Sequence, residues 1–184
     1  ALVPGGAVAD VVIAFMDGRL IASPLTENRR VVENLGSLPL ADVDIDVIID
    51  CGRLGQAGPP PALLERCALT AVVLNATLRS VMSARVHLPV LRDHPRLNSK
   101  DSGHLGLIVV GEGQPYGRRE IAKVLDVPVL ASIAHDPQTA THFSDGKPRH
   151  RRFDSSPLTR SVRDASFQLS TTTQRSAELV GGRS

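Results

Sequence analysis

Asp50 is the residue whose type and position most directly suggest chemistry. It belongs to the segment DVIIDCG at residues 46–52, in which an apolar run predicts a buried strand that ends on the aspartate. A carboxylate at such a strand end can hold Mg²⁺ through a water molecule beside a bound nucleotide. It can equally cap the loop after the strand. A phosphoacceptor in a receiver domain is a third interpretation, but the acidic pair and the lysine that such a domain needs are not evident.

The residues that bind nucleotide phosphates do not accompany Asp50. A phosphate-binding loop supplies backbone N–H groups from a Gly-rich turn, a lysine, and a Ser or Thr for Mg²⁺. The only Gly-Lys pair is Gly146-Lys147, which Pro148 follows, after the last predicted strand. We therefore expect either that the phosphate loop lies upstream of Ala1 or that the protein lacks it.

Nucleophilic and metal chemistry have less support. Cys51 precedes Gly52 and Arg53, but a phosphate-cradling phosphatase loop needs its arginine about six residues after the cysteine, where Ala57 stands. We interpret Cys51 as a buried thiol, since free cysteine packs as a small hydrophobe. The six histidines include no i, i+4 pair of the kind that binds zinc from one helix.

A basic run near the C-terminus offers a surface for anions. It contains Lys147, Arg149, Arg151 and Arg152. Such a run can contact DNA phosphates or an acidic lipid surface. We favour a solvated loop, because Phe153 is the only aromatic residue nearby that could stack on a base.

The length and composition are those of one globular domain. Of the 184 residues, 42% are hydrophobic and 3% aromatic, so the core must be aliphatic. We expect one domain over residues 1–169, incomplete at its N-terminus, and a disordered Ser/Thr/Gly-rich tail over 170–184. The apolar runs are far shorter than the roughly 20 residues that a bilayer requires, which excludes a transmembrane segment.

Charge and cysteine content favour a cytoplasmic protein. The 21 basic and 19 acidic residues are mixed along most of the chain, so composition alone predicts no nucleic-acid partner. Two cysteines are too few for a disulfide framework, which favours a reducing compartment. The opening ALVPGG lacks the features of a secretory signal. We expect a cytoplasmic location, with peripheral membrane contact as a further option.

Short apolar runs predict strands, and apolar residues at helical spacing predict helices between them. The predicted strands are 11–15, 19–22, 46–51, 70–74, 105–110 and 129–133. The predicted helices are 26–35, 62–67, 76–88, 118–125, 136–143 and 157–169. In the helix over 76–88, which Pro89 ends, we expect Leu78 and Met82 in the core.

The alternation of strands and helices, about every 25 residues, is typical of right-handed βαβ crossovers. The predicted fold class is therefore α/β, with three layers: a mostly parallel sheet and helices on both faces. Ligands of such sheets bind at the carboxyl ends of the strands. That edge would bring together Asp50, the loop after Leu74, and the loops at 111–117 and 134–137.

The order of these motifs resembles the MinD/ParA family of deviant P-loop ATPases over residues 19–169. DVIIDCG resembles the family's Walker B strand, TAVVLNATLRSVMSA its next strand and helix, LGLIVVGEG its base-recognition strand, and VPVLASIAHDP its base-contacting loop. GKPRHRRFDSSPLTRSVRDAS is similar to its Gly-Lys-Pro loop, Ser-Pro and final helix. The resemblance implies a P-loop NTPase-like sheet whose first strand and phosphate loop are missing from this chain.

The resemblance also implies function. Family members bind ATP between two subunits, hydrolyse it slowly, and position plasmids, chromosomes, septa, or pilus and secretion machinery. By the resemblance, Asp50 is the magnesium-side aspartate, Gly55 is the switch glycine, and the base is lined by Gly111, Asp136 and Pro137. ATP and Mg²⁺ are expected if the upstream loop exists. A homodimer or a protein partner is expected, and the helix over 76–88 can serve self-association.

Departures from the family pattern favour a degenerate site. Residues 51–54 stand where prolines often follow the Walker B aspartate, Gly111 stands where an adenine-contacting Asn is common, and Ala134 stands where a Pro is common. The alternative function is therefore a non-catalytic scaffold or protein-interaction domain that has lost nucleotide binding. A small-molecule enzyme on a flavodoxin-like sheet has no supporting catalytic constellation.

Overall fold

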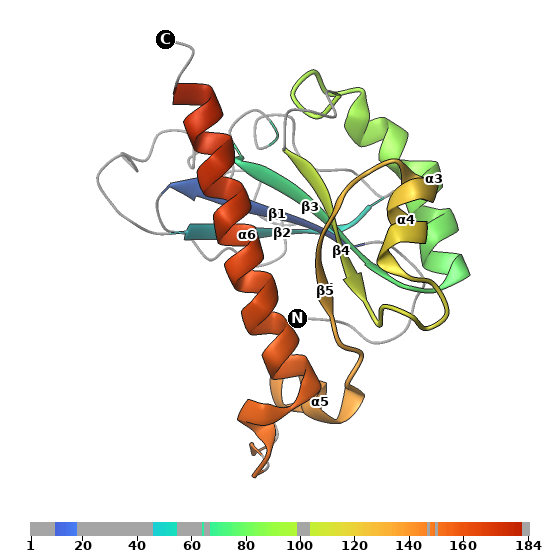
Figure 1. Ribbon diagram of the computed structural model, residues 1–184, viewed down its shortest axis with the longest axis vertical. Coiled ribbons are helices and arrows are strands. Elements are labelled where there is room, and N and C mark those ends of the chain that lie inside the picture. The colour runs from blue at the N-terminus through green and yellow to red at the C-terminus, as the bar shows by residue number, and fades with distance from the viewer. Residues whose placement is uncertain are drawn as a thin grey trace.

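In the computed structural model of the chain, five strands of the described residues form one sheet (Figure 1). The structure describes residues 10–17, 46–54, 64, 67–98, 104–146, 148–149 and 151–181. The strands are β1 (Asp10–Asp17), β2 (Asp46–Arg53), β3 (Leu69–Asn75), β4 (Leu105–Val110) and β5 (Val129–Ile133). Their order in the sheet is β2-β1-β3-β4-β5.

The sheet is mostly parallel, as predicted. β3, β4 and β5 are parallel neighbours. β1 is antiparallel to both β2 and β3, so β2 points in the same direction as β3. Four of the five strands therefore share one direction, and β1 alone opposes them.

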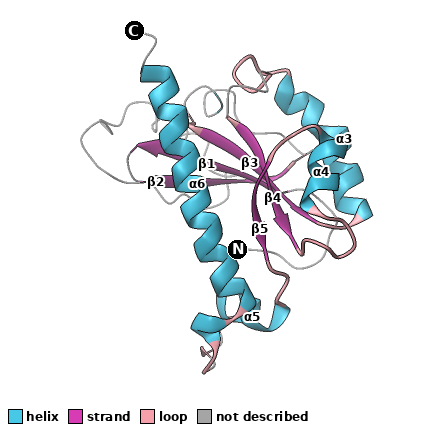
Figure 2. Ribbon diagram, in the orientation of Figure 1, coloured by secondary structure: helices cyan, strands magenta, loops and turns pink. Residues whose placement is uncertain are grey.

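Helices cover both faces of the sheet, which confirms the three-layer α/β architecture (Figure 2). In chain order they are α3 (Leu78–Arg92), α4 (Arg118–Leu125), α5 (Pro137–Ser144), the short 3₁₀ helix η2 (Phe153–Ser155) and α6 (Pro157–Gly181). On one face, Leu88 of α3 and Ile121 of α4 belong to the same apolar cluster as Leu107 of β4. On the other, Ala165 of α6 packs with Ile108 of β4.

The core is aliphatic and centred on β3 and β4. Leu69, Val72, Leu107 and Val109 have no measurable exposure. Strands buried on both faces need apolar residues at consecutive positions rather than at alternate ones. The runs LTAVVLN and LGLIVV meet this requirement.

The position between β2 and β3 is filled by β1. The sequence led us to expect that a strand of the family's sheet would be missing, which would leave this sheet incomplete. Instead, β1 pairs on both edges, through Val12 with Asp50 on one side and with Ala71 on the other. The predicted strand 19–22 and helix 26–35 lie outside the described residues, as does most of helix 62–67.

Two predictions about α3 are wrong. The helix does not end at Pro89 but continues to Arg92. Leu88 and Leu91, on either side of the proline, are both buried, and their burial outweighs the backbone hydrogen bond that proline cannot donate. Leu78 and Met82 are exposed rather than in the core. α3 has two apolar stripes, and periodicity alone does not tell which one faces the sheet.

The disordered tail expected after residue 169 is also wrong, because α6 continues to Gly181. The hydroxyl groups of Thr171 and Thr172 donate to the backbone carbonyls of Phe167 and Gln168, each at 2.9 Å. These bonds within the helix satisfy the hydroxyls that would otherwise compete for the backbone. No helix in the described part of the chain combines the length and hydropathy needed to cross a bilayer.

We predict that Gly106→Ala destabilises the sheet. A Cβ at Gly106 would lie 2.3 Å from Leu130 Cδ1, and Leu130 packs with Leu69 and Leu169 between the sheet and α6. Overpacking of this kind costs about 1–3 kcal/mol, which urea unfolding will measure. Gly117→Ala is the control for an added methyl group without a clash, because the nearest atom to its Cβ is 3.7 Å away, and it should lose only the small amount that alanine costs at an N-cap.

The double variant Gly106→Ala/Leu130→Ala tests the cause. Removing the Leu130 side chain removes the clash, so the double variant should lose less stability than the sum of the two single variants. Additive losses, or an unchanged urea midpoint for Gly106→Ala, would contradict the predicted clash.

Candidate functional site

Three loops meet at the carboxyl edge of the parallel strands. The loop after β3 is joined to β4 by the Ala76 N–H, which donates to the Val110 carbonyl at 2.9 Å. The loop after β4 is joined to β5 by the Gly111 N–H, which donates to the Ile133 carbonyl at 2.8 Å. The three loops expected after Leu74, Val110 and Ile133 are therefore brought together.

The loop at 111–117 is closed by its own backbone. The Gly113 N–H donates to the Tyr116 carbonyl at 2.8 Å, and the Gln114 N–H donates to the Gly111 carbonyl at 3.0 Å. The Tyr116 N–H donates to the Ala76 carbonyl of the neighbouring loop at 3.3 Å. The loop is thus held by bonds to itself and to the β3 loop.

The first amides of α4 are satisfied by carboxylates of the chain. Glu120 Oε2 accepts from the Gly117 N–H at 2.9 Å, and Glu112 Oε1 accepts from the Arg118 N–H at 3.2 Å. Negative charge at a helix N-terminus is favourable because the helix dipole places partial positive charge there. The two glutamates thus occupy two of the donors that an anionic ligand would use at this helix.

Gly111 lies in a tight position against the β5 loop. It is buried and has a φ of +73°, and a Cβ there would approach His135 Cβ at 3.2 Å. A larger side chain would be strained in this left-handed conformation and crowded by His135. The geometry explains a glycine here without a ligand, and the contact of Gly111 with a base stays a prediction.

Asp136 caps α5. Its Oδ1 accepts from the Thr139 N–H at 3.1 Å, and its Oδ2 accepts from the Thr139 hydroxyl at 2.7 Å. Pro137 occupies the first turn of the helix, where a missing N–H costs nothing. Asp136 and Pro137 thus form a helix start, and their contact with a base stays a prediction.

Asp50 does not lie at the edge with the other predicted site residues. β2 continues beyond it to Arg53. Val12 of β1 pairs with Asp50 on one side and with Ala71 of β3 on the other, so Asp50 and Ala71 lie at the same level of the sheet. Ala71 precedes the end of β3 at Asn75 by four residues, or about 13 Å of strand. The expectation that Asp50 shares the edge is therefore wrong, because β1 sets the register of β2. Gly55 lies outside the described residues.

The described cysteines and histidines form no evident reactive centre. Burial raises the pKa of the Cys67 thiol, whose sulfur lies 3.3 Å from Thr70 Oγ1. A raised pKa keeps the thiol protonated and so unreactive. Cys51 is half-buried and packs against the main apolar cluster. Within the described ranges, no three His, Cys, Asp or Glu side chains gather into a metal site.

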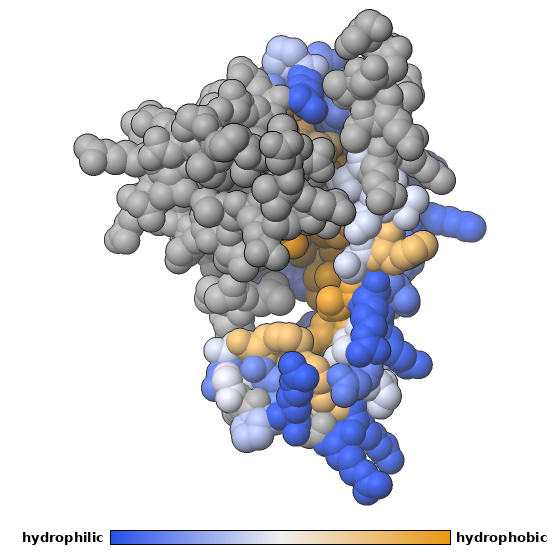
Figure 3. Space-filling model, turned by 90° about the vertical axis from the view of Figure 1, so that its left-hand side faces the viewer, coloured by the Kyte–Doolittle hydropathy of each residue, from blue (hydrophilic) through white to orange (hydrophobic). Residues whose placement is uncertain are grey.

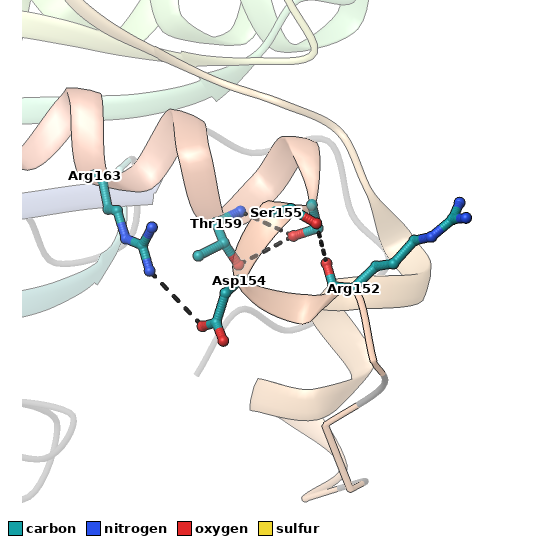
Figure 4. Close-up of polar contacts among 6 residues, drawn as sticks. Arg152, Asp154, Ser155, Thr159 and Arg163 are labelled. Atoms are coloured by element: carbon teal, nitrogen blue, oxygen red, sulfur yellow. Dashed lines mark hydrogen bonds and ion pairs between the residues drawn. The ribbon is translucent and has the colours of Figure 1, made fainter.

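The basic run lies at the end of the molecule that carries α5, η2 and the start of α6. Arg149, Arg151 and Arg152 are exposed, and hydrophilic side chains gather on this end (Figure 3). Figure 4 shows the Arg152 side chain directed away from the helices, while its carbonyl accepts from the Ser155 hydroxyl. Lys147 lies outside the described residues.

An aromatic cluster supports this basic end. The guanidinium of Arg149 lies 4.8 Å from the centre of the Phe153 ring. Phe153 is buried, and the exposed Phe143 lies 5.5 Å from it. The sequence predicts the basic loop but not the contact between Phe143 and Phe153, because the two residues are ten positions apart. Glu112 and Glu120 were likewise missed, although the spacing of Gly117 and Glu120 is that of a helix start.

We predict that Asp136→Ala lowers the free energy of unfolding by about 1 kcal/mol, the usual effect of losing an N-cap. Asp136→Asn should lose less, because its amide oxygen can still accept from the Thr139 N–H. Thermal unfolding followed by circular dichroism will compare the two, with Gln138→Ala, an exposed neighbour, as control. Equal stability of Asp136→Ala and the unchanged protein would show that the cap contributes nothing.

The fold is similar to that of a solved ParA family protein. The chain matches the crystal structure of a ParA family ATPase from Chlorobium tepidum TLS, with a TM-score of 0.50 and 14% sequence identity. The match covers 84% of this chain and 77% of that one. No family model matches the chain, and neither does any curated protein. The likeness shows the fold, which is a ParA-like α/β sheet with helices on both faces.

Proposed function

We propose that the chain is a ParA-like domain that acts in cellular positioning or assembly as a non-hydrolysing scaffold. The processes would be those of the MinD/ParA family that the sequence resembles: partitioning, septum placement, or assembly of a pilus or secretion apparatus. The ParA-like fold supports the class of protein. The direction of β1 is the observation that carries the loss of hydrolysis.

A phosphate loop has to follow a strand whose carboxyl end lies at the ligand edge. β1 occupies the position between β2 and β3 but runs opposite to them. Its amino end, at Asp10, therefore lies toward the edge where the three loops meet, and its carboxyl end, at Asp17, points away. A loop that follows β1 therefore leaves at the end of the sheet opposite to the edge where the three loops meet. It cannot bind phosphates at that edge.

The residues at the edge also do not fit Mg²⁺ and ATP. A nucleotide-bound magnesium needs an aspartate near the phosphates, and Asp50 is level with Ala71, well back from the edge. An anion needs free amide donors, and those of Gly117 and Arg118 bond to glutamates. Residues 1–184 hold no Gly-rich loop with Lys-Ser or Lys-Thr.

ATP binding is the second candidate function. The convergence of the loops after β3, β4 and β5 favours it, because nucleotides bind at such edges in α/β proteins. It would require a phosphate loop from outside residues 1–184, together with a shift of β2 that brings Asp50 to the edge. In that case a homodimer around ATP would be the working form.

We predict that the full-length protein gives no saturable heat when titrated with Mg·ATP, at ligand concentrations up to about 1 mM, where a functional site would be filled. The reason is that, among the described residues, β1 runs in the wrong direction to lead into a phosphate loop at the carboxyl edge, and Asp50 lies back from that edge. Isothermal titration is the measurement, with Mg·ADP as a second ligand. Saturable binding that Asp50→Ala abolishes would refute the scaffold and establish the second candidate.

A further inference from the structure

The outer side of α3 exposes a row of large apolar side chains. Leu78, Met82, Val86 and Val90 are 58%, 44%, 66% and 68% exposed. They are spaced four residues apart, so they form one continuous ridge along the helix. We refer to these four residues as the α3 ridge. They are four of the nine large hydrophobic residues exposed in the described part of the chain.

The α3 ridge has no role in the core of the domain. The opposite side of the helix already packs against the sheet, through Val81, Ala84, Leu88 and Leu91. An exposed apolar row on a helix that is already docked is typical of a second interaction surface. Side chains in a ridge of spacing four fit the groove of another helix.

The rim of the ridge is basic. Arg79 and Arg85 are exposed on the same outer side of α3, and the helix sequence LRSVMSARVHLPVLR contains no acidic residue. Among the described residues neither arginine has an acidic partner. Arg92, in contrast, turns to the end of α4, where it donates to the Leu125 carbonyl at 3.0 Å. Arg79 and Arg85 therefore remain available to a partner.

Electrostatic repulsion disfavours a second copy of the chain as the partner of this surface. Two α3 helices packed ridge to ridge would bring the two pairs of Arg79 and Arg85 together, and the C-cap Asp93 of each helix is the one carboxylate that α3 itself offers to pair with them. Like charges across an interface are unfavourable. A lipid surface fits poorly too, since helices that lie on membranes bury Trp, Phe and Leu over a broad face. The α3 ridge is one side chain wide and has no aromatic residue.

We infer that the α3 ridge docks an acidic amphipathic helix of another protein. Apolar residues of that helix, at positions i and i+4, would pack along the ridge. Its Glu or Asp residues would pair with Arg79 and Arg85, whose guanidinium groups bind carboxylates in a bidentate manner. This inference deepens the scaffold function and rests on it, because it names the partner that the scaffold holds.

Two labelled peptides of about 20 residues test the inference by fluorescence anisotropy. Both carry the same apolar residues at i and i+4; one has Glu at the flanking positions and the other has Lys. A single helix on one ridge makes a small interface, so we expect a dissociation constant on the order of 10 μM for the Glu peptide. The Lys peptide should bind at least about tenfold more weakly.

Variants on the exposed surface separate the apolar contribution to peptide binding from the contribution of charge. Met82→Ser/Val86→Ser should weaken the Glu peptide by about tenfold or more, because the ridge loses its centre. Arg79→Glu/Arg85→Glu should reverse the preference toward the Lys peptide. Val162→Ser, an exposed apolar residue of α6, is the control and should change neither affinity. Circular dichroism will confirm that every variant is folded.

Three results would overturn the inference. The first is equal binding of both peptides, or no reversal by Arg79→Glu/Arg85→Glu. The second is concentration-dependent dimerisation, measured by light scattering, that Met82→Ser/Val86→Ser abolishes. The third is co-sedimentation with phosphatidylserine vesicles that the same variant abolishes. Saturable ATP binding would refute the scaffold function but leave the peptide result intact, so the two failures can be told apart.

Discussion

The pairing of β1 on both of its edges is the constraint on which the rest of the structure depends. Among the described strands, β1 is the hydrogen-bonded neighbour of β2, so the register of β1 fixes how far Asp50 lies from the carboxyl edge. The direction of β1 decides which connections leave at that edge. The contrast between a ParA-like fold and an Asp50 that lies back from the carboxyl edge follows from this single strand.

The sequence predicts the elements whose cause is local. β3, β4 and β5 are consecutive apolar runs, α4 has apolar residues at helical spacing, and their alternation predicts the parallel sheet and the meeting of its loops. The position of β1 is not predictable in this way, because its partners are distant in the chain and an apolar run does not show which strands it will pair with. The predicted position of Asp50 at the carboxyl edge is wrong for the same reason, because the register of β2 depends on its pairing with β1.

The candidate site shows a similar division. The sequence points to Gly111, Asp136 and Pro137 as residues of the edge, because they follow the strands that end there. It does not show that Asp136 already bonds to Thr139 or that Glu112 and Glu120 bond to the start of α4. In α3, two apolar stripes compete for one core, and only the packing shows which of them is left outside.

The place of β2 at one margin of the sheet also bears on how the protein folds. β3, β4 and β5 with their intervening helices form from adjacent chain segments, whereas β1 must close a long loop to reach β3. Within the described part of the sheet, β2 is held through β1, so β2 joins after β1 and is released when β1 detaches. Local opening begins where the fewest neighbours hold a segment. The strand that most resembles a catalytic element is thus among the last parts of the sheet to assemble and the first to be released.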